Sequence, residues 1–492
     1  MKRDIRWYDF ITINIFFLGL TALSQTMVPL ILPLLVQEFV GNLQKGAYLG
    51  VLRLWSLMVA LLVQALSGML SDRCTLRWGR RRPFVFVGTI SAILLIVAVG
   101  FTSEMEGIAG YWILFIVTTL LQAAANIAHG GVQGLIPDIV PKEMHGRFSG
   151  IKALLEVPVP VILVAFTIAP FISQGNMWGG IFVLIGILTV TLAITMLVPE
   201  RPLPPPQTPL NWIPFLRLLL MTGIFTGIIL GMGELISLTA RFIDAQGIDN
   251  LRAQLVVMGG MGLIAMSTAV IGGVTAGVRI SLDRKQRQRV PSFRWWVINR
   301  LAFLIGAFNL AGFAVYFLQA RLGFTRETAA EPASRMMMFV GVFILLSALI
   351  SGWLTDRFGR KRIAGLSGLL ATLGILVMLA APNLTWIYIG GSIVGLGTGM
   401  FYSANWALGA SLVPKEEAGR YLGVSNLAGA GAGAVGAYIG GPIADFFTVN
   451  APQWPGLGYL LIFALYAVLF MLSVVILLKV EEPATNSPPS ML

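Results

Sequence analysis

A single carboxylate stands inside a long apolar stretch of the chain. Glu156 belongs to the segment "ALLEVPVPV", residues 153–161, and the surrounding run from Ile151 to Ile172 contains no other acid. Pro158 and Pro160 follow it, and because proline lacks an amide proton they interrupt the backbone hydrogen-bond ladder beside the acid. A buried carboxylic acid favours its neutral form and can exchange a proton near neutral pH. The sequence therefore predicts proton transfer at Glu156.

Polar and aromatic residues in other apolar stretches could bind a solute. Six residues are candidates for this contact: Gln25, Asn126, Tyr402, Asn405, Trp406 and Asn426. The last four fall in two stretches, 363–410 and 421–444, that contain no charged residue. Amide groups bond hydroxyls and an indole ring stacks on a flat apolar face, so this set suits an uncharged polyol such as a sugar. The alternative is aromatic packing combined with hydrogen bonds between helices.

A loop motif with an acid and several arginines occurs twice. "GMLSDRCTLRWGRRR" begins at Gly68 and "GWLTDRFGRKR" begins at Gly352. Carboxylates and guanidinium groups at equivalent places can form ion pairs in one state and release them in another, and the glycines allow tight turns. We expect a conformational latch in each copy, the alternative being simple anchoring by positive charge. The latch residues are Asp72, Arg73, Gly79, Arg80 and Arg81 in the first copy and Asp356, Arg357, Gly359 and Arg360 in the second.

A second repeated motif shows that the whole chain is duplicated. "VPKEMHGRFSG" begins at Val140 and "VPKEEAGRYLG" begins at Val413, with identical spacing of the shared residues. Both motif pairs occur in the same order, which is the signature of an internal repeat.

The elements that position these residues are membrane-spanning helices. Only 11% of the 492 residues are charged and 57% are hydrophobic, and the mean hydropathy is +0.83. A soluble domain carries about a quarter charged residues, whereas a spanning helix needs roughly 20 consecutive apolar ones. Fourteen such runs follow one another, and they are continuous rather than alternating. The fold class is therefore all-α and integral to the membrane.

The duplication divides these fourteen runs into two halves with two extra helices between them. We expect a six-helix bundle in residues 1–200, a linker with two inserted helices in 201–294, and a second six-helix bundle in 295–480. The inserted helices are the runs 212–237 and 252–280, and we expect them to pack outside the central cavity. The tail 481–492 is rich in proline and polar residues, which is typical of disorder.

Depth in the membrane brings the carboxylate close to a histidine. If the fifth helix begins near Arg147, Glu156 lies ~14 Å along it, at 1.5 Å per residue. If the fourth helix ends at Pro137, His129 lies ~12 Å deep on an antiparallel neighbour. We expect Glu156 and His129 to meet and to couple the protein to protons. The alternative is that each is a satisfied structural group.

The distribution of Lys and Arg between the loops predicts how the helices are oriented in the membrane. Of the 34 Lys and Arg residues, 27 lie in or beside alternate loops and 7 lie on the opposite side. Basic loops stay in the cytoplasm, so we expect a multi-pass protein of the cell membrane with both termini cytoplasmic. The net charge of +12 is thus a topology signal, and we expect no nucleic-acid partner.

With duplicated six-helix halves and this loop after the second helix, the chain resembles the major facilitator superfamily. The resemblance implies two pseudosymmetric bundles around a central cavity that works by alternating access. The expanded loop "SDRCTLRWGRRRPF", residues 71–84, is similar to that of plant-type sucrose transporters and the glycoside/cation symporter group. "NWALGASLVPKEEAGRYLGVSN", residues 405–426, is similar to prokaryotic members of that branch. The two extra helices resemble fourteen-helix drug/proton antiporters, which carry a Gly-Pro-rich motif where this chain has Val-Pro-Val-Pro.

These observations favour a secondary active transporter that moves a small neutral solute, such as a sugar or glycoside, in symport with protons. One alternative is proton-coupled export of a drug or amphiphile, and another is a membrane receptor or pigment-assembly factor without transport. One cysteine, two histidines and no nucleotide-binding or nucleophile motif predict no enzyme, no metal and no cofactor. We expect the partners to be the solute, protons and the lipid bilayer, and the protein to be a monomer.

Overall fold

The apolar runs form helices, as their continuous hydropathy predicts. The structure is a computed structural model that describes residues 6–200, 211–413 and 418–481, and these residues contain no β-strand. Most of the predicted linker at 201–210, nearly all of the predicted tail and residues 414–417 of the second repeated motif lie outside the described residues.

The first half, up to residue 200, contains six spans, several of them built from more than one helix. Its helices are α1 Asp9–Thr12, α2 Ile15–Thr26, η1 Met27–Ile31, α3 Leu32–Val40, α4 Lys45–Ser71, α5 Arg82–Thr102, α6 Gly107–Val132, α7 Leu135–Ile139, η2 Lys142–Met144, α8 His145–Glu156, α9 Pro158–Thr167, α10 Ala169–Ser173 and α11 Met177–Thr195.

The inserted pair and the second half contain longer helices. They are α12 Ile213–Ala245, α13 Leu251–Ser281, α14 Arg284–Arg289, α15 Pro291–Gly312, α16 Ala314–Leu322, α17 Ala330–Phe358, α18 Arg360–Ala380, α19 Leu384–Leu412, α20 Ala418–Asn450 and α21 Leu457–Leu477. In the described part of the chain, 13 helical spans are long and apolar enough to cross a membrane, and the bent pair α15–α16 raises this to as many as 14.

Prolines break the spans where the sequence predicts. In the fifth span, α8 ends at Glu156 and α9 begins at Pro158, because Pro158 cannot donate the next hydrogen bond of the ladder. A second break comes at Ile168, before Pro170. In the first span, Pro29 lies within the π-helical turn η1, which accommodates the extra residue without ending the span. Both spans are therefore irregular next to residues that line the cavity described below, Pro29 and Val157.

The ninth span differs from the expected single helix over 295–318. It is bent by 69° at Phe313, between α15 and α16. The sequence gives no proline here. At the bend, a Cβ placed on Gly312 would overlap the guanidinium of Arg53, which comes from α4. The absence of a side chain at Gly312 therefore allows a charged group from the other half to approach the backbone at the bend.

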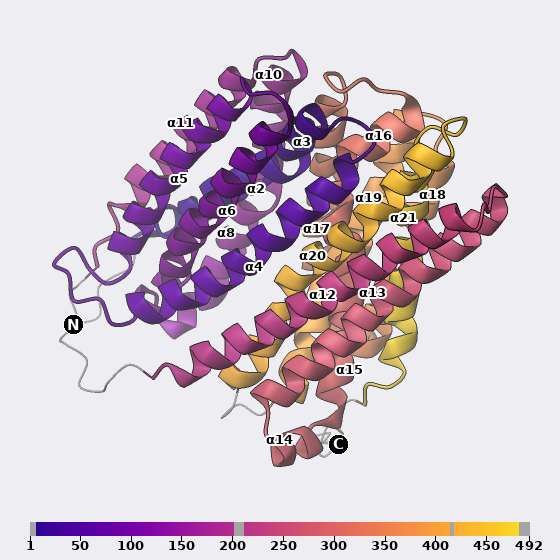
Figure 1. Ribbon diagram of the computed structural model, residues 1–492. Coiled ribbons are helices and arrows are strands. Elements are labelled where there is room, and N and C mark those ends of the chain that lie inside the picture. Colours follow the sequence, from indigo (N-terminus) through magenta and orange to yellow (C-terminus); the bar gives the residue numbers. More distant parts are fainter. Residues whose placement is uncertain (1–5, 201–210, 414–417, 482–492) are drawn as a thin grey trace.

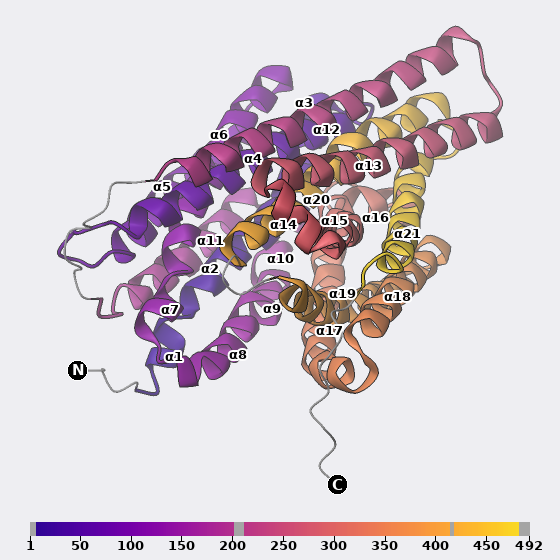
Figure 2. The same cartoon turned by 90° about the horizontal axis from the view of Figure 1, so that it is seen from below.

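The two halves form separate groups of helices that meet along a central seam (Figure 1). The main contacts across the seam join α4 to α20, and α9 and α10 to α17. Figure 2 shows the same division from below. We call the end of the molecule that carries the loop 72–81 and the turn before α8 the basic end, and the opposite end the far end.

Hydrogen bonds close the seam at the far end. The side-chain amides of Gln37 and Gln319 donate to each other at 3.1 and 3.0 Å. The hydroxyl of Tyr316 donates to the carbonyl of Pro33 at 2.7 Å. Arg326 pairs with Glu38. These contacts tie α3 to α16 and to the loop that follows it.

Asp445 on α20 is a buried acid in contact with the opposite half. Its side chain is only 7% exposed, and its two oxygens accept hydrogen bonds from the backbone amides of Gly46 (2.9 Å) and Ala47 (2.7 Å). These amides are free donors at the positive N-terminus of α4. Asp445 therefore caps a helix of the opposite half and joins the two halves at the far end.

The inserted helices α12 and α13 run side by side along one flank of the molecule (Figures 1 and 2). Both pack on α20, α12 also contacts α4, and α13 contacts α15 and α21. Phe225 of α12 packs against Gly273 of α13 and Gly431 of α20, where the missing side chains let the helices approach closely. Glu234 is mostly exposed and stands 3.9 Å from Arg241. The pair lies outside the bundle, except that Leu218 reaches the cavity described next.

Candidate functional site

A cavity of about 900 Å³ lies on the seam between the two halves. Its wall reaches from Arg53, about two turns into α4 from the far end, to Gly68 and Gln133 near the basic end. Because the far end is closed by the contacts above, this conformation has its cavity on the basic side of the seam.

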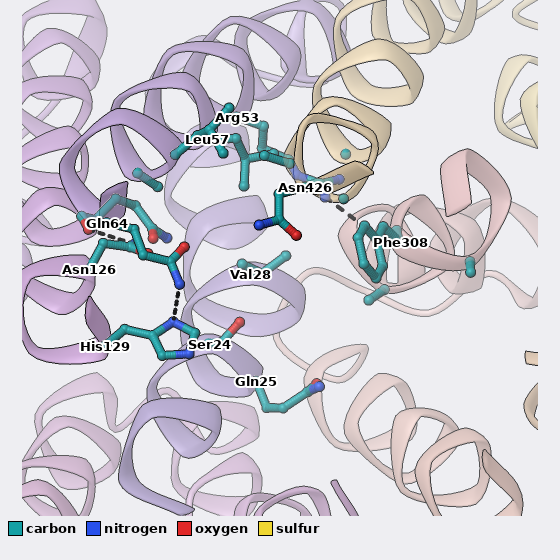
Figure 3. Close-up of a pocket in the computed structure, with 18 of the residues that line it drawn as sticks. Ser24, Gln25, Val28, Arg53, Leu57, Gln64, Asn126, His129, Phe308 and Asn426 are labelled. Atoms are coloured by element: carbon teal, nitrogen blue, oxygen red, sulfur yellow. Dashed lines mark hydrogen bonds between the residues drawn. The ribbon is translucent and has the colours of Figure 1, made fainter. Parts of the chain in front are cut away.

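Six side-chain amides line the cavity, and four of the predicted solute-binding residues are among its lining. The amides are Gln25, Gln64, Gln122, Asn126, Gln133 and Asn426. Tyr402 also lines the cavity, together with Ser24 and Thr398. In Figure 3 the side chains of Gln25, Asn126 and Asn426 gather around one space from three different helices. The structure thus brings Gln25, Asn126, Tyr402 and Asn426 together.

Asn405 and Trp406 lie outside the cavity, in contrast to the prediction. Asn405 is fully buried between α15 and α19, where its amide donates to Asn299 at 2.9 Å and its oxygen accepts from Arg300 at 3.2 Å. Trp406 lies beside Trp296, with the guanidinium of Arg300 4.7 Å from its ring centre. Asn405 serves helix packing, because the neighbouring α15 supplies partners that the sequence pattern does not reveal, whereas Trp406 is 43% exposed and contacts α15 through Trp296 and Arg300.

Glu156 lies at the last position of α8, next to the proline break. It forms an ion pair with Lys152, one turn earlier, at 3.3 Å, and its side chain is 35% exposed. The following residue, Val157, lines the cavity, and the carboxylate is close enough to interact electrostatically with Tyr402 of the other half. Lys152 was missed by the sequence analysis, although the i, i+4 spacing is a known signal for such a pair.

His129 lines the cavity but takes different partners from the predicted one. The amide of Gln64 lies 3.4 Å from Nδ1 and the amide of Gln133 lies 3.0 Å from Nε2. Phe17 meets the imidazole edge to face, and the ammonium of Lys152 sits 4.3 Å from the centre of the same phenyl ring. Phe17 and Lys152 therefore stand near His129, and no hydrogen bond joins His129 to Glu156 among the described residues.

Arg53 is a charged lining residue that is not among the predicted solute-binding residues. A long basic side chain near the end of a span can extend outward to the interface. Instead Arg53 is 6% exposed and crosses the seam, where Nη1 donates to Oδ1 of Asn309 at 2.9 Å and Nη2 approaches the carbonyl of Phe308 at 3.5 Å. Figure 3 shows Arg53 in the cavity wall, with Asn426 and Phe308 beside it.

The first copy of the loop motif forms an ion-pair cluster at the basic end. Arg81 pairs with Asp72 and donates through Nε to Asp138 at 2.8 Å, and Arg80 donates through Nε to the same carboxylate at 2.9 Å. Burial by itself would lower the pKa of Arg81, but Asp138 and Asp72 raise it above the ordinary value, so the guanidinium stays charged. Asp138 belongs to α7, near the second repeated motif. The first motif thus contacts the short helix that directly precedes the second motif.

Glu200 caps the N-terminus of α5. Its carboxylate accepts from the backbone amides of Arg81, at 2.9 Å, and Arg82, at 3.1 Å, at the N-terminus of α5. Gly79 has a φ of +110°, and a Cβ there would overlap Glu200. Glycine is therefore needed both for the turn and for the approach of the acid. Arg73 is also engaged in an interaction.

The second copy of the motif is built differently. Arg357 stacks near Trp353 and Phe358, with its guanidinium carbon 5.2 and 5.6 Å from their ring centres. Gly359, at a φ of +92°, turns the chain directly into α18, which begins at Arg360. Within the described residues Asp356 forms no ion pair. In the repeat alignment the position of Asp138 is occupied by Ser411, so this half lacks the carboxylate that joins the arginines of the first half.

We predict that the two motif copies respond unequally to loss of their acids. Asp138→Asn should slow exchange several-fold, because it removes the carboxylate shared by Arg80 and Arg81. Asp356→Asn should have a smaller effect. The measurement is the initial rate of solute exchange at matched protein levels, with Asp249→Asn in the exposed loop between the inserted helices as the control. Equal rates for wild type and Asp138→Asn would contradict the latch role.

Comparison with known proteins identifies the family. The profile of the Major Facilitator Superfamily matches residues 15–324 and 298–491. The minor myo-inositol transporter IolF of Bacillus subtilis is 31% identical over 137 residues, which are 28% of this chain and 30% of that protein. The sucrose transport protein SUT1 of Oryza sativa is 40% identical over 48 residues, 10% of this chain and 9% of that one. The multi-drug resistance efflux pump PmrA of Streptococcus pneumoniae is 30% identical over 131 residues, 25% of this chain and 33% of the pump.

The chain thus aligns with a third or less of each of these relatives. Among solved structures, a peptide transporter POT has a TM-score of 0.64 at 14% identity, with 95% of its chain and 97% of this one covered. At that identity the likeness establishes the fold alone.

The helices, the seam cavity and the profile match agree with one another. The chain is a multi-pass membrane protein and not an enzyme, and the family implies that it carries a small molecule. The chain belongs to the major facilitator superfamily.

Proposed function

We propose that the protein carries a small solute rich in hydroxyl groups, such as a sugar or glycoside, in symport with protons. The observation that carries this proposal is the cavity on the seam, with its six side-chain amides. Each amide offers both donors and acceptors, which is what a polyol needs when it leaves water. Relatives named for myo-inositol and sucrose transport support the same solute class.

The coupling residue in this proposal is Glu156. It lies at a helix break beside the cavity and pairs with Lys152 rather than with a group that is permanently buried. Protonation of Glu156 would remove this ion pair and change the charge facing Tyr402. His129 is proposed to set the local field through Gln64 and Gln133, and not to accept the proton from Glu156 directly.

Alternating access in this proposal moves residues 1–200 against residues 295–480 around the cavity, with the segment 201–294 attached along one side. The basic end faces the cytoplasm of the cell, which follows from the excess of Lys and Arg on that side. The conformation described here would then be open inward. The protein works as a monomer in the cell membrane, and the ion-pair cluster acts as the conformational latch.

A second candidate is the export of an amphiphilic compound in exchange for protons. Part of the cavity wall favours it, because Leu57, Leu61, Phe308, Met337 and Ile344 form an apolar side. The sequence similarity of this chain to an efflux pump also favours the export function. Only one phenylalanine and one methionine line the cavity against six amides, and the polyol proposal is therefore preferred. A receptor without transport activity is disfavoured by the open cavity.

Transport by purified protein in liposomes tests this proposal. Uptake of a labelled panel of sugars, glycosides and cyclic polyols would be compared with that of lipophilic dyes, with and without a pH gradient. Accumulation of a polyol that depends on an inward proton gradient supports the proposal. Movement of dyes alone would replace it with the export function.

A further inference from the structure

The cavity wall contains one buried positive charge that no carboxylate neutralises. Arg53 is 6% exposed and lies on the seam. Its guanidinium has five N–H donors, and two of them approach protein acceptors, on Asn309 and Phe308. Both acceptors are uncharged. Donors of Arg53 thus remain free in a wall that surrounds an open cavity.

The surroundings of Arg53 hold it in place. A Cβ on Gly312 would overlap its Nη1, and a Cβ on Gly433 would come within 3.3 Å of its Nη2. Asn309, its main acceptor, is fixed in turn because its amide donates to the carbonyls of Ile305 (2.8 Å) and Ala432 (3.0 Å). The guanidinium therefore sits where α4, α15 and α20 meet, in a position that the backbone of three helices defines.

The other buried cations have partners that Arg53 lacks. Arg81 pairs with Asp72 and Asp138 at the basic end. Lys45 lies 4.5 Å from the ring centre of Tyr316, at the far end, in the field of Asp445. Arg300 lies against two tryptophan rings outside the cavity. Among the residues that line the cavity in the described chain, Arg53 is the one Arg or Lys, and none is Asp or Glu.

An unpaired charge in the membrane interior is costly, and such residues usually mark the path of a substrate. A guanidinium recognises planar or tetrahedral oxyanions through two parallel hydrogen bonds. The amides of Asn426 and Gln25 face the same space (Figure 3). An anionic group at Arg53 would leave the remainder of a small molecule among these amides.

We propose that Arg53 binds a negatively charged group of the solute, so that the cargo is an acidic polyol, a sugar carboxylate or a sugar phosphate. This inference rests on the proposed polyol transport, and it replaces the neutral solute expected from the sequence with an acidic one. The positive charge of Arg53 selects the acid over the corresponding neutral sugar. Symport of one proton with a singly charged acid then moves no net charge.

Ligand-induced thermal stabilisation of the purified, full-length protein tests the assignment. Three probes share one ring: glucose, glucuronate and glucose 6-phosphate. We expect one of the acids to bind wild type at least about ten-fold more tightly than glucose, since a charge-assisted bidentate contact is worth that much. Stronger thermal stabilisation by glucuronate indicates a sugar carboxylate as the cargo. Stronger stabilisation by glucose 6-phosphate indicates a sugar phosphate.

Two variants at the same site make the result specific. Arg53→Gln should lose the preference for the acid and retain weak glucose binding. Asn309→Asp keeps Arg53 but places a carboxylate against it, and it should lose the same preference. Arg241→Gln, an exposed arginine on α12, is the control and should behave as wild type.

An acid preference that survives in both variants would overturn the inference. So would a wild-type protein that is stabilised equally by glucose and by the acids, or that is stabilised by neither acid. Uptake of glucose without any acid preference would leave the proposed polyol transport intact while removing the role of Arg53. Failure of every polyol in the liposome assay would remove the proposed function itself.

Discussion

Replacing Glu156 by glutamine is expected to abolish the accumulation of solute driven by a pH gradient. Glutamine keeps the size and most of the hydrogen-bonding capacity of the acid, but it cannot take up or release a proton. Exchange of labelled for unlabelled solute needs no net proton movement, so it should continue at a reduced rate. The measurement is paired uptake and counterflow in liposomes that contain the purified variant.

Two variants separate proton coupling from structure. Glu234→Gln, on the outside of α12, removes an exposed acid with a cationic neighbour and should leave accumulation unchanged. Lys152→Gln removes the partner of Glu156 and should weaken the coupling of uptake to the proton gradient, because the ion pair that protonation of Glu156 would break is no longer formed. If the Glu156→Gln protein still concentrates solute against a gradient, Glu156 is structural and another residue carries the proton.

Filling the cavity should stop transport without unfolding the protein. Gly429 lines the cavity, and a Cβ built on it meets no atom within 4 Å. Gly429→Trp therefore projects a large ring into the solute space, and helix propensity does not oppose the change. We expect the rate of solute exchange to fall at least about ten-fold. A ten-fold slower rate corresponds to an activation free energy of transport that is higher by roughly 1.4 kcal/mol.

The matched control is Gly223→Trp on α12, where a Cβ also meets no atom within 4 Å and the residue is exposed on the outside of the molecule. Both variants would be compared for folded yield by size-exclusion chromatography. Normal exchange by Gly429→Trp would show that the solute does not pass through this cavity.

Periodicity, repeats and proline positions predict most of the fold. The inserted runs 212–237 and 252–280 correspond to α12 and α13, although α12 continues to Ala245. The break beside Glu156 follows directly from Pro158. The 69° bend at Phe313 could not be predicted, because it lies where Gly312 meets Arg53 from the other half. Local sequence does not encode which distant residue approaches a helix.

The same limit explains the errors at the candidate site. Polar residues within apolar runs are readable from sequence, and Gln25, Asn126 and Asn426 among them do line the cavity. Direction around the helix axis depends on the neighbour. Asn405 is buried against Asn299, and Arg53 crosses the seam instead of extending to the interface.

Asp445 shows that the N-terminus of a helix can hold a carboxylate of the opposite half. Near the end of a span, an acid can reach water. The free amides of Gly46 and Ala47 bind it instead, and this contact becomes visible only once α4 and α20 are adjacent.

The central claim is that the far end must open and close for the protein to move its solute. Gln37 and Gln319 exchange hydrogen bonds across the closed far end. Gln37→Cys and Gln319→Cys, in a Cys74→Ser background that removes the native thiol, allow the two halves to be joined by a short reducible thiol cross-linker. The measurement is solute exchange in liposomes before cross-linking, after it, and after reduction. The account predicts that exchange stops when the cross-link forms and returns on reduction, whereas full exchange through the cross-linked protein would contradict it.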